Sequence, residues 1–151
     1  MLEFDEFKIL MDDIKATSKL NVDLFSELKT TKEKTNKCSI MASQNWHKNT
    51  NDAIKYCQAK GLKPDVILSC DYEDFLKRLG SNDKFIFLPK TPETLSRIVV
   101  EARMMGMTVI ANNRIGATKE DWFKLKGEDL IEIMYKKRKE IPTIIMETFK
   151  K

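Results

Sequence analysis

The stretch KFIFLPKTPETLSRIVVEARMMGMTVIA, residues 84–111, decides the fold of this chain. It opens with an apolar run at 84–88, which predicts a buried β-strand. Apolar side chains then recur at helical spacing over 92–105, and Gly106 marks the end of that helix. A second apolar run follows at 108–111. Strands that are apolar throughout and separated by helices are typical of a parallel sheet covered on both faces.

The same alternation continues on both sides of this stretch. Two more strands are expected at 39–43 and 65–69. The remaining expected helices share apolar residues at helical spacing, and they cover 51–60, 72–79, 128–138 and 143–149. The chain therefore predicts an α/β fold, a three-layer Rossmann-like domain with a parallel sheet of about four strands flanked by helices.

The first 36 residues differ in character and are expected to form an N-terminal helical segment, followed by the Rossmann-like domain over 37–151. An apolar stripe within 4–14 predicts one helix, and a second is expected over 22–33, with Phe25 among its inward residues. The stripe must pack on the sheet of this domain or on another chain.

Composition excludes several classes of protein. A length of 151 residues, 42% hydrophobic and 33% charged, suits one globular domain. We expect no membrane span, because no apolar run is long enough, and no signal peptide, so the expected location is cytoplasmic. Cys38, Cys57 and Cys70 fit a reducing compartment, and with a single histidine they make no zinc pattern.

The loops that follow the strands are expected to bear the site. Right-handed crossovers bring these loops to the carboxyl edge of the sheet, where ligands bind in such folds. Lys48 precedes a helix start and could contact a phosphate there, or it could be a solvated side chain beside a helix cap. In the third loop, Thr91 and Pro92 predict a helix start. Arg97 and Glu101 are four apart, so a surface ion pair is the ordinary explanation of both.

An ordered set of features surrounds the third loop. Glu93 and Glu101 are separated by seven residues, an alanine follows the second glutamate, and an apolar strand lies on either side of the pair. This set resembles the carboxyl-terminal, donor-binding half of the GT-B, group-1 (family 4-like) glycosyltransferases. The loop at 115–117 resembles the family's glycine-bearing loop, and Lys48 resembles its donor-phosphate lysine. The resemblance covers about residues 37–150.

This resemblance implies transfer of a sugar from a nucleotide-sugar donor, such as a UDP- or GDP-sugar, with no metal and no further cofactor. Lys48 would neutralise the charge that develops on the leaving diphosphate. Glu93 would meet hydroxyl groups of the transferred sugar. These two residues are the catalytic residues that the resemblance implies.

The implied donor-binding residues follow Glu93 in the sequence. Glu101 would accept hydrogen bonds from the ribose hydroxyls, because a carboxylate can accept from both members of a diol. The backbone N–H groups of Thr94, Leu95 and Ser96 would face the diphosphate at a helix N-terminus. Arg97 would supply positive charge in place of an arginine that the family has ahead of its lysine.

The chain departs from the family pattern in two respects. The family usually has Gly-Phe-Gly where residues 94–96 are Thr-Leu-Ser, so side chains replace glycines that let a backbone approach a ligand. A GT-B enzyme also has an amino-terminal acceptor domain, which 36 residues cannot form. We therefore expect transfer only with an acceptor-domain partner chain or as a homo-oligomer. A non-catalytic nucleotide- or sugar-binding module is the alternative.

Two further classes receive little support. The basic run at 136–139 contributes to the net charge of +4, but such runs are usually solvated helix faces, and Tyr135 is the one aromatic residue beside it. Nucleic acid is therefore not an expected partner. A classical dinucleotide oxidoreductase is not expected either, because no Gly-x-Gly-x-x-Gly follows the first strand.

Overall fold

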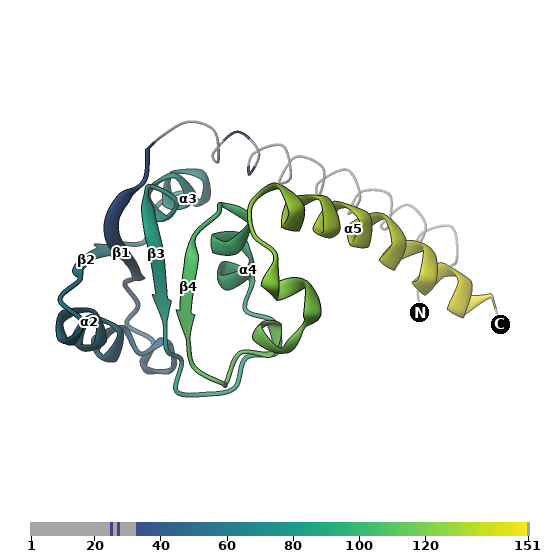
Figure 1. Ribbon diagram of the computed structural model, residues 1–151. Helices are drawn as coiled ribbons and strands as arrows, with labels where there is room; N and C mark the ends of the chain where they lie inside the picture. The colour runs from purple at the N-terminus through teal and green to yellow at the C-terminus, as the bar shows by residue number, and fades with distance from the viewer. Residues whose placement is uncertain (1–24, 26, 28–32, 151) are drawn as a thin grey trace.

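The computed structural model describes Phe25, Glu27 and residues 33–150. Its strands form a four-stranded sheet in the order β2-β1-β3-β4, and each neighbouring pair is parallel (Figure 1). The strands are β1 (Thr35–Met41), β2 (Lys63–Ile67), β3 (Asn82–Phe87) and β4 (Thr108–Ala111). The predicted α/β fold, a short parallel sheet between layers of helices, is confirmed.

Helices alternate with these strands along the chain. The α-helices in the described part are α2 (Thr50–Ala59), α3 (Tyr72–Leu79), α4 (Arg97–Met104) and α5 (Glu128–Phe149), and the short 3-10 helices are η1 (Trp46–Lys48), η2 (Gly116–Lys119) and η3 (Asp121–Lys124). α2 packs on one face of the sheet, whereas α3, α4 and the start of α5 pack on the other. None of the described helices is long and apolar enough to cross a membrane.

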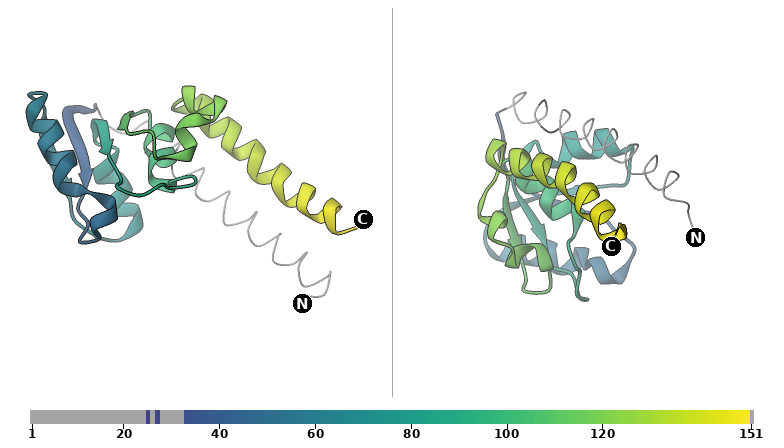
Figure 2. Two further views of the ribbon diagram at one scale, coloured as in Figure 1. Left: turned by 90° about the horizontal axis from the view of Figure 1, so that it is seen from below. Right: turned by 90° about the vertical axis from the view of Figure 1, so that its right-hand side faces the viewer.

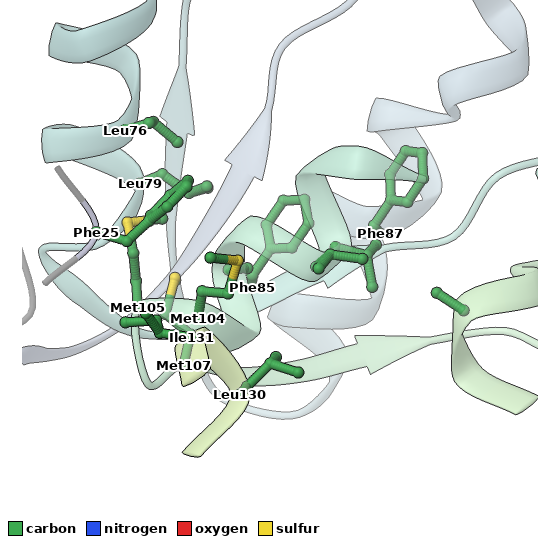
Figure 3. Close-up of a cluster of buried hydrophobic side chains, with 14 of the residues drawn as sticks. Phe25, Leu76, Leu79, Phe85, Phe87, Met104, Met105, Met107, Leu130 and Ile131 are labelled. Atoms are coloured by element: carbon green, nitrogen blue, oxygen red, sulfur yellow. The ribbon is translucent and has the colours of Figure 1, made fainter. Parts of the chain in front are cut away.

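The central strand β3 is buried on both faces. Phe85 and Phe87 belong to the larger core, under α3, α4 and α5, whereas Ile86 belongs to the smaller core under α2. Successive side chains of a strand point to opposite faces, so both faces of this strand need apolar residues. Figure 3 shows Phe85 near methionines of the larger core, with Phe87 further from them along the same strand. This double burial explains the uninterrupted apolar run in the sequence.

Phe25 joins the N-terminal segment to this core. Its side chain is 1% exposed and packs in the larger cluster (Figure 3), so the prediction that Phe25 points inward is confirmed. The other predictions for 4–14 and 22–33 fall outside the described residues. β1 begins at Thr35, just before the expected domain boundary at 37.

Three of the four strands begin earlier than predicted. β1, β2 and β3 start at Thr35, Lys63 and Asn82, whereas the apolar runs start later. The side chains of Thr35 and Lys63 are exposed although their backbones pair in the sheet. Hydrophobic patterning detects only the buried part of a strand, so it could not find these polar ends.

The helix predicted over 92–105 also starts later. α4 begins at Arg97, so the predicted helix start at Thr91 and Pro92 is wrong. The residue before α4, Ser96, has a φ of 62°, and the chain ahead of it is not helical. The end of the helix is as expected, with Gly106 beyond it at a φ of 78°.

The C-terminal region forms one helix rather than two. α5 runs for 22 residues through Pro142, where helices over 128–138 and 143–149 were predicted. A proline inside a helix removes one backbone hydrogen bond, and here the helix continues past that loss. Figure 2 shows that the C-terminal half of α5 extends away from the sheet.

Candidate functional site

The order of the strands locates a crevice between β1 and β3. From β1 the chain passes through α2 to β2 on one side, and then crosses back through α3 to β3 on the other. In open α/β sheets, ligands bind outside the carboxyl ends of the strands at such a switch point. The loops after β1 and β3 meet there: the N–H of Lys90 donates to the carbonyl of His47 at 2.9 Å, and Asn49 Nδ2 donates to the carbonyl of Leu88 at 2.8 Å. These two hydrogen bonds hold the loop after β1 and the loop after β3 together as one surface.

The residues Lys48 and Glu93 come together on this surface. Lys48 Nζ lies 2.6 Å from Glu93 Oε1, although the residues are 45 positions apart in the sequence. Their side chains are 33% and 18% exposed, so water still reaches both. Lys48 Nζ also lies 5.5 Å from the centre of the Phe87 ring, which adds a cation–π contact. The loop lysine is therefore a paired side chain and not a freely solvated one.

Glu93 is fixed by backbone pairing rather than by a helix. Its N–H donates to the carbonyl of Arg114 at 2.9 Å, and its carbonyl accepts from the N–H of Gly116 at 2.8 Å, so it pairs with the loop after β4. A residue bound to that loop in an extended conformation cannot also belong to the first turn of α4. This pairing is the physical reason why the helix starts late.

Glu101 occupies the same edge of the sheet, in the middle of α4. Its Oε1 accepts a hydrogen bond from the Tyr72 hydroxyl at 2.5 Å and lies 3.1 Å from Arg97 Nε. The predicted ion pair of Arg97 with Glu101 is confirmed, but Glu101 is buried, at 6% exposed, and the pair is not an ordinary surface pair. Burial raises the pKa of Glu101 above its ordinary 4.5, against the opposing effects of the Tyr72 hydrogen bond and of Arg97 and Arg138.

Two of these neighbours, Tyr72 and Arg138, were not identified from the sequence. Burial and then the hydrogen bond to Glu101 raise the pKa of Tyr72, so its hydroxyl stays protonated and donates. Burial lowers the pKa of Arg138 while the charges of Tyr72 and Glu101 raise it, so this arginine of the basic run acts on the site. The one sequence signal was the position of Tyr72 at the start of a helix after β2, at the carboxyl edge.

The two acidic residues line one open depression of about 310 Å³. The residues around it come from β1, η1, α3, α4 and the loop before α4; they are Met41, Lys48, Tyr72, Phe75, Glu93, Ser96, Arg97, Ile98 and Glu101. This volume is at the lower end of the range for small-molecule sites. Five of the seven implied site residues, Lys48, Glu93, Ser96, Arg97 and Glu101, are therefore brought together.

Thr94 and Leu95 do not line this depression, and the helix position predicted for residues 94–96 is wrong, because α4 begins after them. Leu95 is 50% exposed. Ser96 has a positive φ, which L-residues other than glycine rarely adopt, and its Oγ is buried without a hydrogen-bond partner among the described residues. Gly116 supports the segment, since a Cβ there would stand 1.8 Å from the Thr94 carbonyl oxygen.

Within the described residues, no group of three or more His, Cys, Asp or Glu side chains is placed to hold a metal ion. No protein-family model, curated protein or solved structure matches the chain. The function is therefore inferred from the fold, the geometry of the depression and the motif resemblance.

Proposed function

We propose that this protein is glycosyltransferase-like and binds a nucleotide-sugar donor in the depression between β1 and β3. Sugar transfer then needs an acceptor-domain partner chain or a second copy. The supporting observation is that Lys48 lines the same depression as Glu93 and Glu101, at the switch point of the sheet, although it lies 45 positions before Glu93 in the sequence.

The chemistry requires a cation beside the leaving group. In the transfer, an acceptor hydroxyl forms a bond to the anomeric carbon of the sugar and loses its proton, and the bond from that carbon to the diphosphate breaks. The nucleoside diphosphate leaves with the electron pair of the broken bond, so negative charge grows on it. Lys48 stabilises this charge. Glu93 holds the Lys48 ammonium in place at 2.6 Å before the donor binds.

The segment between Glu93 and α4 is suited to the diphosphate. Ser96 stands where the family motif has its second glycine, and its φ of 62° is one that glycine adopts without strain. A left-handed residue that leads into a helix turns successive N–H groups toward one side and forms a concavity for anions. The backbone N–H groups of residues 95–98 donate to no backbone acceptor among the described residues.

The buried carboxylate Glu101 is suited to a ribose diol. Tyr72 and Arg97 both approach Oε1, and no hydrogen bond of Oε2 is found within the described part of the chain. A carboxylate held through one oxygen presents the other as an acceptor in a fixed direction. Tyr72 and Arg97 thus orient Glu101 toward the depression that it lines.

The alternative, a binding module without transfer activity, also has an observation in its favour. Thr94 and Ser96 bear side chains where the family has its two glycines, and α4 begins only at Arg97. A backbone with side chains there approaches a diphosphate less closely than glycine does. Such a module would bind the nucleotide sugar but neither transfer nor hydrolyse it.

Calorimetric titration with UDP, GDP, ADP and their glucose and mannose derivatives tests the proposal. We expect micromolar binding to one base, weakened by more than about tenfold, or about 1.4 kcal/mol, in Glu101→Ala. Glu132→Ala is the matched control, because Glu132 is an exposed glutamate that pairs with Lys136 on α5. No binding at about 1 mM ligand, or equal loss in the control, would contradict a donor site.

Activity separates transferase from module. With a donor that binds, the wild-type protein plus its partner should release nucleoside diphosphate, and Lys48→Met should slow this release by about 100-fold or more. Donor binding with no release under any condition would favour the module.

A further inference from the structure

A second depression lies on the other side of the loop after β1. It has a volume of about 350 Å³. The residues around it are polar except for one tryptophan; they are Ser43, Gln44, Asn45, Trp46, Asn49, Thr50, Asn51, Asp52, Lys55 and Lys90. It shares no lining residue with the proposed donor depression.

Trp46 is the unusual member of this set. Its side chain is 63% exposed and belongs to neither hydrophobic core, and the ring contact recorded for it is with His47, at 3.8 Å between centroids. A single exposed apolar residue is ordinary on a protein surface. Trp46 differs because it lines a polar depression, where its indole offers a broad apolar face next to hydrogen-bonding groups.

The loop that bears Trp46 is held by hydrogen bonds of its own. Asn45 Oδ1 accepts from the N–H of His47 at 3.0 Å, and the N–H of Asn45 donates to Ser43 Oγ at 3.1 Å. The Lys90 N–H fastens the same loop to the loop after β3. An indole on a fixed loop loses little conformational freedom when a ligand binds.

Several polar side chains around Trp46 are available to a ligand. Gln44, Asn51 and the Lys90 ammonium make no hydrogen bond or ion pair with any described residue, and Asp52 is held only by Lys55 at 3.9 Å. Together they offer amide donors, amide acceptors, a carboxylate and an ammonium. Asp52, Lys55 and Lys90 give the lining a formal charge of only +1, and a single aromatic ring is present, so the depression suits neither a nucleic-acid strand nor a purely apolar ligand.

These features match the chemistry of a pyranose ring. One face of such a ring is formed by C–H groups that can stack on an indole, and its hydroxyls project from the edge toward hydrogen-bonding side chains. Since 3-10 helices have 3.0 residues per turn, side chains two positions apart in η1 point in directions that differ by about 120°. A ring stacked on Trp46 therefore lies beside Lys48 but outside the donor depression.

We propose that this depression binds a pyranose unit of the acceptor glycan. The acceptor role rests on the proposed function, whereas pyranose binding at Trp46 does not. The donor and the acceptor would then be held by one domain, on two sides of the loop that contains Lys48, and a partner chain would need only to complete the site.

The test is a titration of the full chain with methyl glucoside, methyl mannoside, methyl galactoside and N-acetylglucosamine. The backbone amide NMR signals of residues 43–52 report binding in every variant, and in the wild type so does the signal of the Trp46 indole N–H. We expect one or more of these sugars to shift that signal saturably with a millimolar dissociation constant. Trp46→Ala should weaken binding at least tenfold and Trp46→Phe should retain part of it. Leu68→Ala is the matched control, because Leu68 is 66% exposed and lies outside both depressions.

Two results would overturn the proposal. One is that none of the four sugars shifts the Trp46 signal up to about 100 mM, and the other is that Trp46→Ala binds as well as the wild type. Glu101→Ala separates this proposal from the donor proposal, because it should weaken nucleotide binding by more than about tenfold and leave sugar binding unchanged. If the protein binds a sugar but no nucleotide, the pyranose site at Trp46 still stands and the donor site is contradicted. The bound pyranose could then not be assigned as the acceptor of a transfer reaction.

Discussion

A single hydroxyl group controls the buried carboxylate of the candidate site. Tyr72 donates to Glu101 Oε1, and a hydrogen bond to a charged group contributes about 1.5–3 kcal/mol. We predict that Tyr72→Phe lowers the free energy of unfolding by about 1–2 kcal/mol and raises the pKa of Glu101 further. Urea denaturation and carboxyl NMR titration measure these effects. Tyr56→Phe is the control, because no hydrogen bond of the Tyr56 hydroxyl is found in the described part of the chain, and an equal loss there would contradict the role of Tyr72.

The raised pKa of Glu101 makes stability depend on pH. Between the ordinary pKa of 4.5 and the raised folded pKa, the folded protein binds more protons than the unfolded protein. The contribution of Glu101 to the free energy of unfolding therefore falls as the pH rises through this window. We predict that Glu101→Gln removes this fall, measured by urea denaturation over a pH series. Glu132→Gln should keep it, and identical curves for wild type and Glu101→Gln would show that Glu101 does not titrate abnormally.

Gly116 is required by the backbone that passes over it. An added Cβ would stand 1.8 Å from the Thr94 carbonyl oxygen, and backbone cannot yield as a flexible side chain can. We predict that Gly116→Ala costs about 2–3 kcal/mol, as overpacking does, and weakens nucleotide binding by moving residues 93–96. Gly61→Ala is the comparison, with open space around the Cβ but a φ of 66°, and should cost only about 1–2 kcal/mol. Equal costs would mean that the close contact is relieved easily.

Among the elements, α4 shows what the sequence could and could not predict. The apolar spacing located the body and the end of the helix, because burial of one face determines both. Its start depended on the pairing of Glu93 with the loop at 114–116, a contact between segments about 20 residues apart that no local pattern records. The hydrogen bond of Tyr72 to Glu101 spans 29 positions and was missed for the same reason.

The start of α4 also stores backbone strain. Ser96 has a φ of 62°, and an L-residue in the left-handed region costs about 1–2 kcal/mol relative to glycine. We predict that Ser96→Gly raises the free energy of unfolding by up to about 1 kcal/mol and leaves nucleotide binding equal or tighter, as thermal denaturation and calorimetry would show. At Asn49, also left-handed, glycine should give no such gain, because the side-chain bond to Leu88 is lost. Destabilisation by Ser96→Gly would mean that the buried Oγ has a partner that stabilises the fold.

At the scale of the whole molecule, β3 links the two cores and the site. Phe85 and Phe87 belong to one core and Ile86 to the other, so neither core can open without exposing this strand. The loop after β3 is bonded to the loop after β1, and the segment that contains Glu93 is bonded to the loop after β4. A ligand in the depression between β1 and β3 would therefore contact loop segments that are linked to three strands, β1, β3 and β4.

This arrangement predicts that donor binding stabilises the entire domain. A ligand at about 100 times its dissociation constant adds about 2.7 kcal/mol, which for a domain of this size raises the melting temperature by about 5–10 °C. We expect this shift with the nucleotide sugar in thermal denaturation, at most about half of it in Glu101→Ala, and the full shift in Trp46→Ala. A pyranose that binds at Trp46 should add its own shift, independent of the nucleotide, because the two depressions share no lining residue. A shift that Trp46→Ala removes and Glu101→Ala preserves would place the nucleotide in the Trp46 depression, and both functional proposals would then be wrong.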